Sequence, residues 1–243
     1  MEKEKYLKIF RGRESLILSL EKNLGYQFKD KSLLVRALIH SSFANEKHED
    51  KLKSNERFEF IGDSVLNYII STTLFKIFPE VNEGTLSKYR SFLVSTNTIY
   101  EISSKMDLGR YLILGKGEEK TGGNKKKNLI VDCFEAIVAA IYFDGGLKNL
   151  RKVILRLYRK KLRELKREDF VLFDYKSKLQ EILAKKGLPS PKYVVLGESG
   201  PDHAKVFRVQ VTIDGEGYGI GTGSSKKEAQ QNAAKNTIFI LKG

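Results

Sequence analysis

The sequence predicts an all-α domain followed by a small α+β domain, and three observations support this fold class. In the first two-thirds of the 243-residue chain, apolar residues recur at helical spacing and no stretch alternates in the manner of a strand. From Asp174 onward, a helical segment precedes three alternating stretches and a last helical segment, which gives the order α-β-β-β-α. A strongly basic segment separates the two parts, so we expect the boundary near 168–173 and domains over 1–168 and 174–243.

The first domain is expected to be a series of helices with apolar stripes. The stripes of the first two helices are Leu16, Ile17, Leu20 and Leu24, and then Leu33, Leu34, Ala37 and Leu38. Gly25 ends the first of these helices, and Asp30 can cap the second. Further helices are expected over 55–78, 85–94, 96–106 and 129–143. The polar residues 43–54 and the Gly- and Lys-rich residues 115–128 are predicted to be loops, the second of them mobile and basic.

The segment 147–167 has a helical pattern but is unusually basic. Between Lys148 and Asp169 there are ten Lys or Arg residues and three acidic residues. One interpretation is a solvated helix face that leads into a linker, which is the usual state of a charge run. The other is an arm that contacts phosphates, and the sequence leaves both interpretations open.

The second domain is expected to be a compact α-β-β-β-α unit of about 70 residues, a size at which a small domain can fold alone. Its helices and strands are expected over 175–185, 193–196, 206–213, 217–221 and 225–241. The three central stretches alternate apolar and polar residues, which is typical of strands with one buried face.

The composition is that of a globular protein with a strong positive charge. Lys and Arg total 44 against 30 Asp and Glu, and the net charge of +14 favours a polyanionic partner such as nucleic acid or an acidic membrane surface. A single Cys excludes a disulfide framework and a Cys-based zinc site, and it indicates a reducing compartment. The apolar run 136–143 is far shorter than the roughly 20 residues that span a bilayer. With no signal-peptide pattern at the N-terminus, we expect a cytoplasmic protein without a membrane partner.

Three acidic residues stand out within the expected helix 55–78. Glu56, Glu59 and Asp63 are spaced by three and then four residues, so their carboxylates share one helix face and repel one another. Gly62 lies among them, although a mid-helix glycine costs about 1 kcal/mol relative to alanine. A glycine at this place is most useful where another helix or a ligand approaches closely.

A second acidic pair, Asp132 and Glu135, lies one turn apart in an otherwise apolar helix. Buried carboxylates are costly unless they are paired or bind a cation. Two facing helices that hold hard divalent cations would explain both groups, and Mg²⁺ prefers such oxygen ligands. The alternative is that the acids form salt bridges with Arg57, Lys88 or Arg90, and the spacing alone does not decide between these interpretations.

The sequence resembles the ribonuclease III family over roughly residues 20–150. The motif ERFEFIGDSVL is similar to the family's signature helix. Three further segments resemble family landmarks in order: GYQFKDKSLLVRALIHSSFANE, FPEVNEGTLSKYRSFLVS and KTGGNKKKNLIVDCFEAIVAAIYFDGG. The resemblance implies an all-α endonuclease domain that forms a homodimer. It also implies hydrolysis of double-stranded RNA with Mg²⁺, for which Mn²⁺ can substitute.

The resemblance also implies roles for individual acidic residues. It assigns metal binding to Glu59, Asp63, Asp132 and Glu135, with Asp63 and Glu135 catalytic. Glu56 and Glu83 match two further acidic positions with an auxiliary role. The departures from the family pattern, at Ile39, Thr121 and Cys133, remove no expected ligand.

The expected chemistry is hydrolysis by a metal-activated water molecule, since the acidic motifs contain no Ser/His/Asp or Cys/His system. The products would carry 5′-phosphate and 3′-hydroxyl ends with short 3′ overhangs. Precursors of ribosomal RNA, messenger RNA and other structured transcripts are the expected substrates. The rival hypothesis is a double-stranded RNA-binding protein whose helical domain only dimerises or docks to ribosomal RNA, but such a protein has no need of four acids beside a polyanion.

The last 70 residues resemble a double-stranded RNA-binding domain, most specifically at GTGSSKKEAQQNAAKNTI. There, hydroxyls can cap the last helix, and two lysines oppose the helix dipole unless phosphates lie at this end. The RNA-contacting residues that the resemblance implies are Tyr175, Lys176, Gln180, Glu181, His203, Ser224, Ser225, Lys226 and Lys227. His203 belongs to a turn that also contains Pro201 and Asp202. Domains of this kind read the shape and 2′-hydroxyls of A-form RNA.

Other candidate residues have simpler interpretations. Cys133 is expected to be a buried apolar residue, and His40 is expected to pack or form a hydrogen bond at the end of its helix. His48 lies in a charged segment and is expected to be solvated. The lysines of 115–127 either belong to a disordered loop or grip RNA near the second acidic motif.

The signature helix itself is the expected dimer interface. Its apolar residues Phe58, Phe60, Ile61 and Val65 cover more than one side of the helix. Gly62 would then allow the close approach of a partner helix, and a two-fold contact would repeat the same surface on both subunits.

Overall fold

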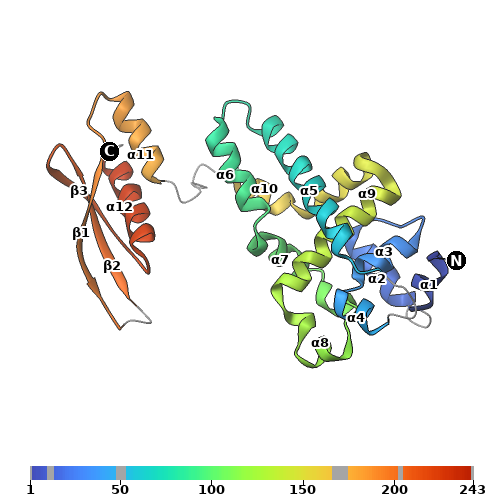
Figure 1. Ribbon diagram of the computed structural model, residues 1–243. Helices are drawn as coiled ribbons and strands as arrows, with labels where there is room; N and C mark the ends of the chain where they lie inside the picture. Colours follow the sequence, from blue (N-terminus) through green and yellow to red (C-terminus); the bar gives the residue numbers. More distant parts are fainter. Residues whose placement is uncertain (1, 10–13, 48–52, 166–174, 202–204, 242–243) are drawn as a thin grey trace. The chain divides into compact units, whose positions relative to one another are not determined.

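The computed structural model describes residues 2–9, 14–47, 53–165, 175–201 and 205–241 (Figure 1). The chain divides into two compact units, Met1–Leu165 and Lys166–Gly243, and each is described by itself below. The boundary expected near 168–173 lies outside the described residues. No helix among these ranges is long and apolar enough to cross a membrane.

The first unit is helical, as predicted. Its longer helices are α1 (Glu2–Ile9), α2 (Glu14–Leu24), α3 (Lys31–Leu38), α5 (Glu56–Ile77), α6 (Glu83–Leu93), α7 (Thr96–Ser104) and α9 (Lys127–Leu157). The shorter ones are α4 (Ser41–Glu46), α8 (Lys116–Lys120) and α10 (Arg159–Leu165), with 3₁₀ turns at Leu108–Tyr111 and Gly123–Lys125. Asp30 caps α3 through a hydrogen bond from the backbone N–H of Ser32, as expected from the sequence.

Two segments predicted as loops are partly helical, so these predictions are wrong. Within 43–54, the first residues continue α4, which His40 caps. Within 115–128, α8 and a 3₁₀ turn are stabilised by contacts that the local sequence does not reveal, among them an ion pair between Lys126 and Glu118. An isolated parallel bridge also joins Ile39 to Ile113 in a region where we expected no strand pairing.

The range of α9 contains two helical segments that meet at a kink, because the backbone angles of Gly146 are not helical. The break expected between the helical segments 129–143 and 147–167 is therefore confirmed, and it lies at Gly146. Gly146 adopts a φ of 72°, a left-handed conformation that glycine reaches without steric cost. Beyond the kink, buried apolar residues recur at helical spacing through α10: Leu150, Val153, Ile154, Tyr158, Leu162 and Leu165. The basic residues of 147–165 therefore surround an apolar stripe that packs in the core.

The pairing of α5 with α9 forms the centre of the first unit. The side chains of Phe58, Leu66, Ile69, Ile70 and Leu74 on α5 are buried. On α9, the buried residues include Phe134, Ile137, Val138 and Ile141. Ile61 and Val65 on the same helix are only half-buried.

The second unit has the predicted α-β-β-β-α order: α11 (Tyr175–Lys185), β1 (Lys192–Ser199), β2 (Val206–Ile213), β3 (Glu216–Gly223) and α12 (Lys226–Ile240). The strands form an antiparallel sheet in the order β1-β2-β3, with Val195 opposite Val209 and Val209 opposite Gly221. The turn between β2 and β3 contains Asp214 and Gly215, both with positive φ.

Small residues bring α12 close to the sheet. Ala229, Ala233 and Ala234 are buried. A Cβ atom on Gly221 would overlap the backbone of Ala233, so only glycine fits at this strand position. The core of this unit combines Leu179 and Leu183 of α11 with apolar residues of β2 and α12.

Candidate metal centre and nucleic-acid interface

Two helices supply the acidic residues of the candidate metal centre. Glu56, Glu59 and Asp63 lie on α5, and Asp132 and Glu135 lie on α9. The helices can approach closely because Gly62 has no side chain: a Cβ atom at this position would overlap the carbonyl group of Glu135. The sequence-based expectation of a close helix approach at Gly62 is confirmed. The approaching helix is α9 of the same chain, and not a partner as we expected for the dimer.

Three of the predicted residues converge. One carboxylate oxygen each from Glu59, Asp132 and Glu135 lie within 4.8 Å of one another, and all three residues are half-buried. Asp63 is exposed one turn along α5, and its Oδ1 accepts a hydrogen bond of 2.8 Å from Nδ2 of Asn67. The structure therefore brings both acidic motifs of the sequence to one place.

The two acids that were predicted to be auxiliary lie at helix starts. Glu56 is exposed in the first turn of α5, where Oε2 accepts a 2.9 Å hydrogen bond from the hydroxyl of Ser54. Glu83 is exposed in the first turn of α6, where Oε1 accepts a 2.7 Å hydrogen bond from the hydroxyl of Ser87. Both positions are favourable for a negative charge, because the N-terminus of a helix carries a partial positive charge.

The carboxylates of the cluster disfavour each other's ionisation. Burial, together with the charges of Asp63, Glu59 and Asp132, raises the pKa of Glu135 to about 8. Burial and the charges of Asp132, Glu56 and Asp63 also raise the pKa of Glu59 above its ordinary value. Burial raises the pKa of Asp132, and the charge of His40 opposes this effect. A cation in the cluster would remove the repulsion.

The cluster fits a hard divalent cation. In the described part of the chain, no ion pair joins a Lys or Arg side chain to Glu59, Asp132 or Glu135, which weighs against the salt-bridge interpretation. The donor set consists of oxygen atoms, which Mg²⁺ and similar cations prefer. Cys133 lies between two of the acids but is fully buried, and burial raises the pKa of its thiol. Its predicted role as a small buried apolar residue is confirmed.

Known proteins share both the sequence and the fold of this chain. Residues 30–162 match the family described as Ribonuclease-III-like. Ribonuclease 3 of Caldanaerobacter subterraneus subsp. tengcongensis is 43% identical over 226 residues, which cover 93% of this chain and 98% of that protein. Ribonuclease 3 of Syntrophobacter fumaroxidans is 44% identical over 226 residues, which cover 92% of this chain and 93% of that protein. The chain belongs to the ribonuclease III family.

A solved structure and a second match extend the assignment. The nuclease domain of ribonuclease III from Campylobacter jejuni superposes with a TM-score of 0.55 at 39% identity, covering 60% of this chain and 95% of that one. Residues 175–241 match the double-stranded RNA binding motif. With this motif beside a ribonuclease III domain, the protein is an endoribonuclease specific for double-stranded RNA.

The start of α12 is built as the sequence predicted. Ser225 caps the helix by accepting a hydrogen bond from the backbone N–H of Glu228. Glu228 in turn accepts hydrogen bonds from the backbone N–H and the hydroxyl of Ser224, at 2.8 and 2.6 Å, which lower the pKa of its carboxyl. Lys226 and Lys227 are exposed in the first turn of α12. The reciprocal bonds satisfy the start of α12, and its first turn presents two cations.

The other residues of the expected RNA interface differ in their surroundings. Gln180 and Glu181 are exposed on α11, and Tyr175 is half-buried at its start. Lys176 is tied into the fold, since its Nζ lies 2.8 Å from Oε1 of Gln230 and 4.4 Å from the ring centre of Tyr193. His203 lies outside the described residues.

One neighbour of the acidic cluster was missed by the sequence-based assignment. His40 forms the hydrogen bond expected of it, but its charge also acts on Asp132. The spacing of His40 and Ser42 was a local signal for a helix cap. The proximity to Asp132 depends on a contact between segments about 90 residues apart, which no local pattern indicates.

Proposed function

We propose that this protein cleaves double-stranded RNA with Mg²⁺ bound by Glu59, Asp63, Asp132 and Glu135, and that Mn²⁺ can replace Mg²⁺. The observation that carries the proposal is the convergence of Glu59, Asp132 and Glu135, whose carboxylates raise each other's pKa. When bound, a divalent cation activates water for attack on the phosphate and stabilises charge on the attacking and leaving oxygens.

The residues of the chain have distinct parts in this proposal. Glu135 and Asp63 act at the reacting phosphate, and Glu59 and Asp132 complete the set that holds the cation. Glu56 and Glu83 have auxiliary parts at the edge of the site. Because the attacking group is water and not the ribose 2′-hydroxyl, the products carry 5′-phosphate and 3′-hydroxyl ends.

A homodimer would place two such sites on one duplex. Three aromatic side chains along α5 support this proposal, because Phe60, Tyr68 and Phe75 are 73%, 52% and 72% exposed. A solved Campylobacter jejuni nuclease domain that is 38% identical, with a TM-score of 0.55 over 60% of this chain and 97% of that one, is described as flexible in a region involved in dimer formation. Phe58 takes no part in the proposed interface, since it is buried against Arg36 within the subunit. One cut on each strand then leaves short 3′ overhangs.

The second unit would hold the duplex without reading its sequence. The proposed contacts are the first turn of α12, with Ser224, Ser225, Lys226 and Lys227, and the exposed face of α11, with Tyr175, Gln180 and Glu181. Lys176 and His203 complete the proposed set. Precursors of ribosomal RNA and structured messenger RNA are the proposed substrates, and the cytoplasmic location stays a prediction.

The decisive experiment incubates a long RNA duplex with the full-length protein, with and without Mg²⁺, and sizes the products on a gel. We expect short duplex fragments with Mg²⁺ alone and an intact duplex in the presence of a chelator. An intact duplex under both conditions, together with tight binding, would favour the rival hypothesis of a protein that only binds RNA. The ends are then identified by whether a 5′-phosphate-dependent exonuclease degrades the denatured products.

A further inference from the structure

Asp63 differs from the other acids of the proposed metal site in its surroundings. The carboxylates of Glu59, Asp132 and Glu135 converge, and none of them accepts a hydrogen bond from another described residue. The Asp63 carboxylate accepts one, from the side-chain amide of Asn67. No ion pair among the described residues reaches Asp63. Within the described ranges, Asn67 is therefore the residue that orients this carboxylate.

One nitrogen of Asn67 holds two oxygen atoms of Asp63. Nδ2 of Asn67 donates to Oδ1 of the Asp63 carboxylate at 2.8 Å and to the backbone carbonyl of the same residue at 3.0 Å. A side-chain amide nitrogen carries two hydrogens, so both bonds can form together. The two residues are four apart on one helix face, and helical side chains point back toward the N-terminus, which brings the amide to Asp63. Oδ1 is thus held beside the backbone of α5, and Oδ2 has no partner among the described residues.

Asparagine is not the residue that helix stability alone would favour at this position. Asn67 lies in the interior of α5 and is half-buried, where alanine or leucine is a better helix former. Its amide is neutral, so it holds Asp63 without neutralising the negative charge that a cation requires. A lysine or arginine in the same place would compete with the cation. A task at the metal site explains why a poorer helix former occupies this position.

The bond to Oδ1 also bears on which cation the site prefers. Ca²⁺ takes more oxygen ligands than Mg²⁺ and accepts both oxygens of one carboxylate. Mg²⁺ requires a nearly octahedral arrangement, keeps several water molecules, and binds through few carboxylates. An Asp63 that offers Oδ2 alone therefore suits Mg²⁺, and release of Oδ1 would improve the site for Ca²⁺.

We propose that Asn67 is a positioning residue of the metal centre: its amide holds Oδ1 of Asp63 against α5, so that Oδ2 alone is offered to the cation, which favours Mg²⁺ over Ca²⁺. The inference rests on the metal site proposed above. Carboxylates that bind metals are commonly held by a further hydrogen bond, and loss of such a partner typically costs about 10- to 100-fold in metal affinity or activity.

Two substitutions of Asn67 separate positioning from stability. Asn67→Leu removes the amide, keeps a similar size and is the better helix former. Asn67→Gln keeps an amide that can bond to a side chain four residues away. We expect calorimetry of the full-length protein without RNA to give roughly 10-fold weaker Mg²⁺ binding for Asn67→Leu, a smaller loss for Ca²⁺, and an intermediate Mg²⁺ affinity for Asn67→Gln. The melting temperature of Asn67→Leu should not fall. Unchanged Mg²⁺ affinity in Asn67→Leu would overturn the proposal, as would equal losses for the two cations.

Control variants separate the role of Asn67 from the metal site itself. Ser64→Ala removes another bond between a side chain and a carbonyl four residues earlier on α5, from the Ser64 hydroxyl to Phe60, and it should change neither cation affinity. If Glu135→Gln loses Mg²⁺ binding and Asn67→Leu does not, only the role of Asn67 fails. If Glu135→Gln also binds Mg²⁺ normally, the proposed metal site fails.

A direct readout of the contact completes the test. The ¹⁵N–¹H₂ signal of the Asn67 amide can be assigned by its loss in Asn67→Leu. In the metal-free protein, Asp63→Ala should shift this signal, whereas Glu56→Ala, which removes another acid of the same helix, should shift it much less. Equal responses to the two substitutions would contradict a bond between Asn67 and Asp63.

Discussion

Gly62 of α5 lies directly against the backbone carbonyl of Glu135 on α9, with no space for a Cβ atom between them. This contact links packing to chemistry, because Glu59, three residues before Gly62, and Glu135 both belong to the acidic cluster. Close approach of the two helices brings carboxylates from both to within reach of one cation. The cost of a glycine inside a helix is offset by this approach.

Gly62→Ala should therefore destabilise the protein, although alanine is the better helix former. The added methyl group must displace α9, and such overpacking typically lowers the free energy of unfolding by about 1–3 kcal/mol. Chemical denaturation followed by circular dichroism measures the loss, and cleavage should fall further than duplex binding. Gly117→Ala in α8 is the matched control, since no atom lies within 4 Å of a Cβ there. Equal stability of both variants would show that the helices separate easily.

Glu135→Gln should abolish cleavage, leave duplex binding, and change how stability depends on pH. The folded-state pKa of Glu135 is raised from 4.5 to about 8, so the folded protein holds this proton more tightly than the unfolded chain. The resulting stabilisation is complete below about pH 4.5 and is lost as pH rises through about 8.

Melting temperatures between pH 5 and 8 test this linkage. Without metal, the wild type should lose stability across this range more steeply than Glu135→Gln. Mg²⁺ should restore the wild type at pH 8 and should have little effect on the variant, because metal binding displaces the proton. Glu216→Gln, an exposed residue of the second unit, is the control and should follow the wild type. Identical pH profiles for Glu135→Gln and the wild type would mean that the carboxyl is ionised without a cation.

The double substitution Lys226→Ala with Lys227→Ala should weaken duplex binding and flatten its salt dependence. Each lost phosphate contact should reduce the slope of log affinity against log salt concentration by about one. Fluorescence anisotropy with a short RNA duplex at several salt concentrations measures both quantities. Lys185→Ala changes an exposed residue at the C-terminal end of α11 and should leave the slope unchanged. If the double variant also keeps the wild-type slope, these lysines point into solvent.

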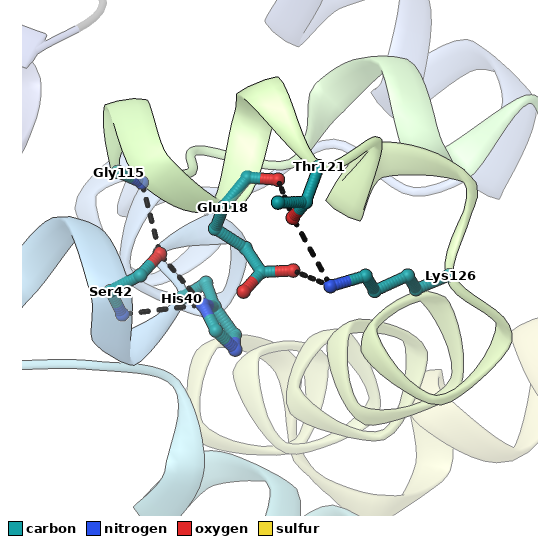
Figure 2. Close-up of polar contacts among 6 residues, drawn as sticks. All are labelled: His40, Ser42, Gly115, Glu118, Thr121 and Lys126. Atoms are coloured by element: carbon teal, nitrogen blue, oxygen red, sulfur yellow. Dashed lines mark hydrogen bonds and ion pairs between the residues drawn. The ribbon is translucent and has the colours of Figure 1, made fainter.

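The sequence was sufficient for the parts of the fold and the site that depend on local patterns. The spacing of Asp132 and Glu135 placed both acids on one face, and a mid-helix Gly62 indicated a close contact. The helices α4 and α8 were missed because they depend on distant partners. The hydroxyl oxygen of Ser42 in α4 accepts the backbone N–H of Gly115, which is 73 residues away (Figure 2). In the same way, the segment before α3 is held by Asp144, whose carboxylate accepts the backbone N–H groups of residues 29 and 30.

Phe60→Glu should separate the proposed dimer into monomers. Phe60 is 73% exposed on α5 within one subunit, next to an acid of the cluster, so its ring contributes little to the stability of the monomer. Loss of a central aromatic residue from an interface typically costs about 2 kcal/mol or more, which is roughly 30-fold in the dissociation constant. A buried glutamate would add a desolvation cost.

Sedimentation equilibrium of the full-length protein at micromolar concentration can decide. We expect a dimer for the wild type, a monomer for Phe60→Glu, and equal melting temperatures in dilute solution. Phe239→Glu is the matched control, because Phe239 is 82% exposed on α12 of the second unit and should leave the dimer intact. The monomeric variant should also lose paired cuts, since one subunit offers only one acidic cluster to the two strands. A wild-type monomer that still produces 3′ overhangs would refute dimerisation through this helix.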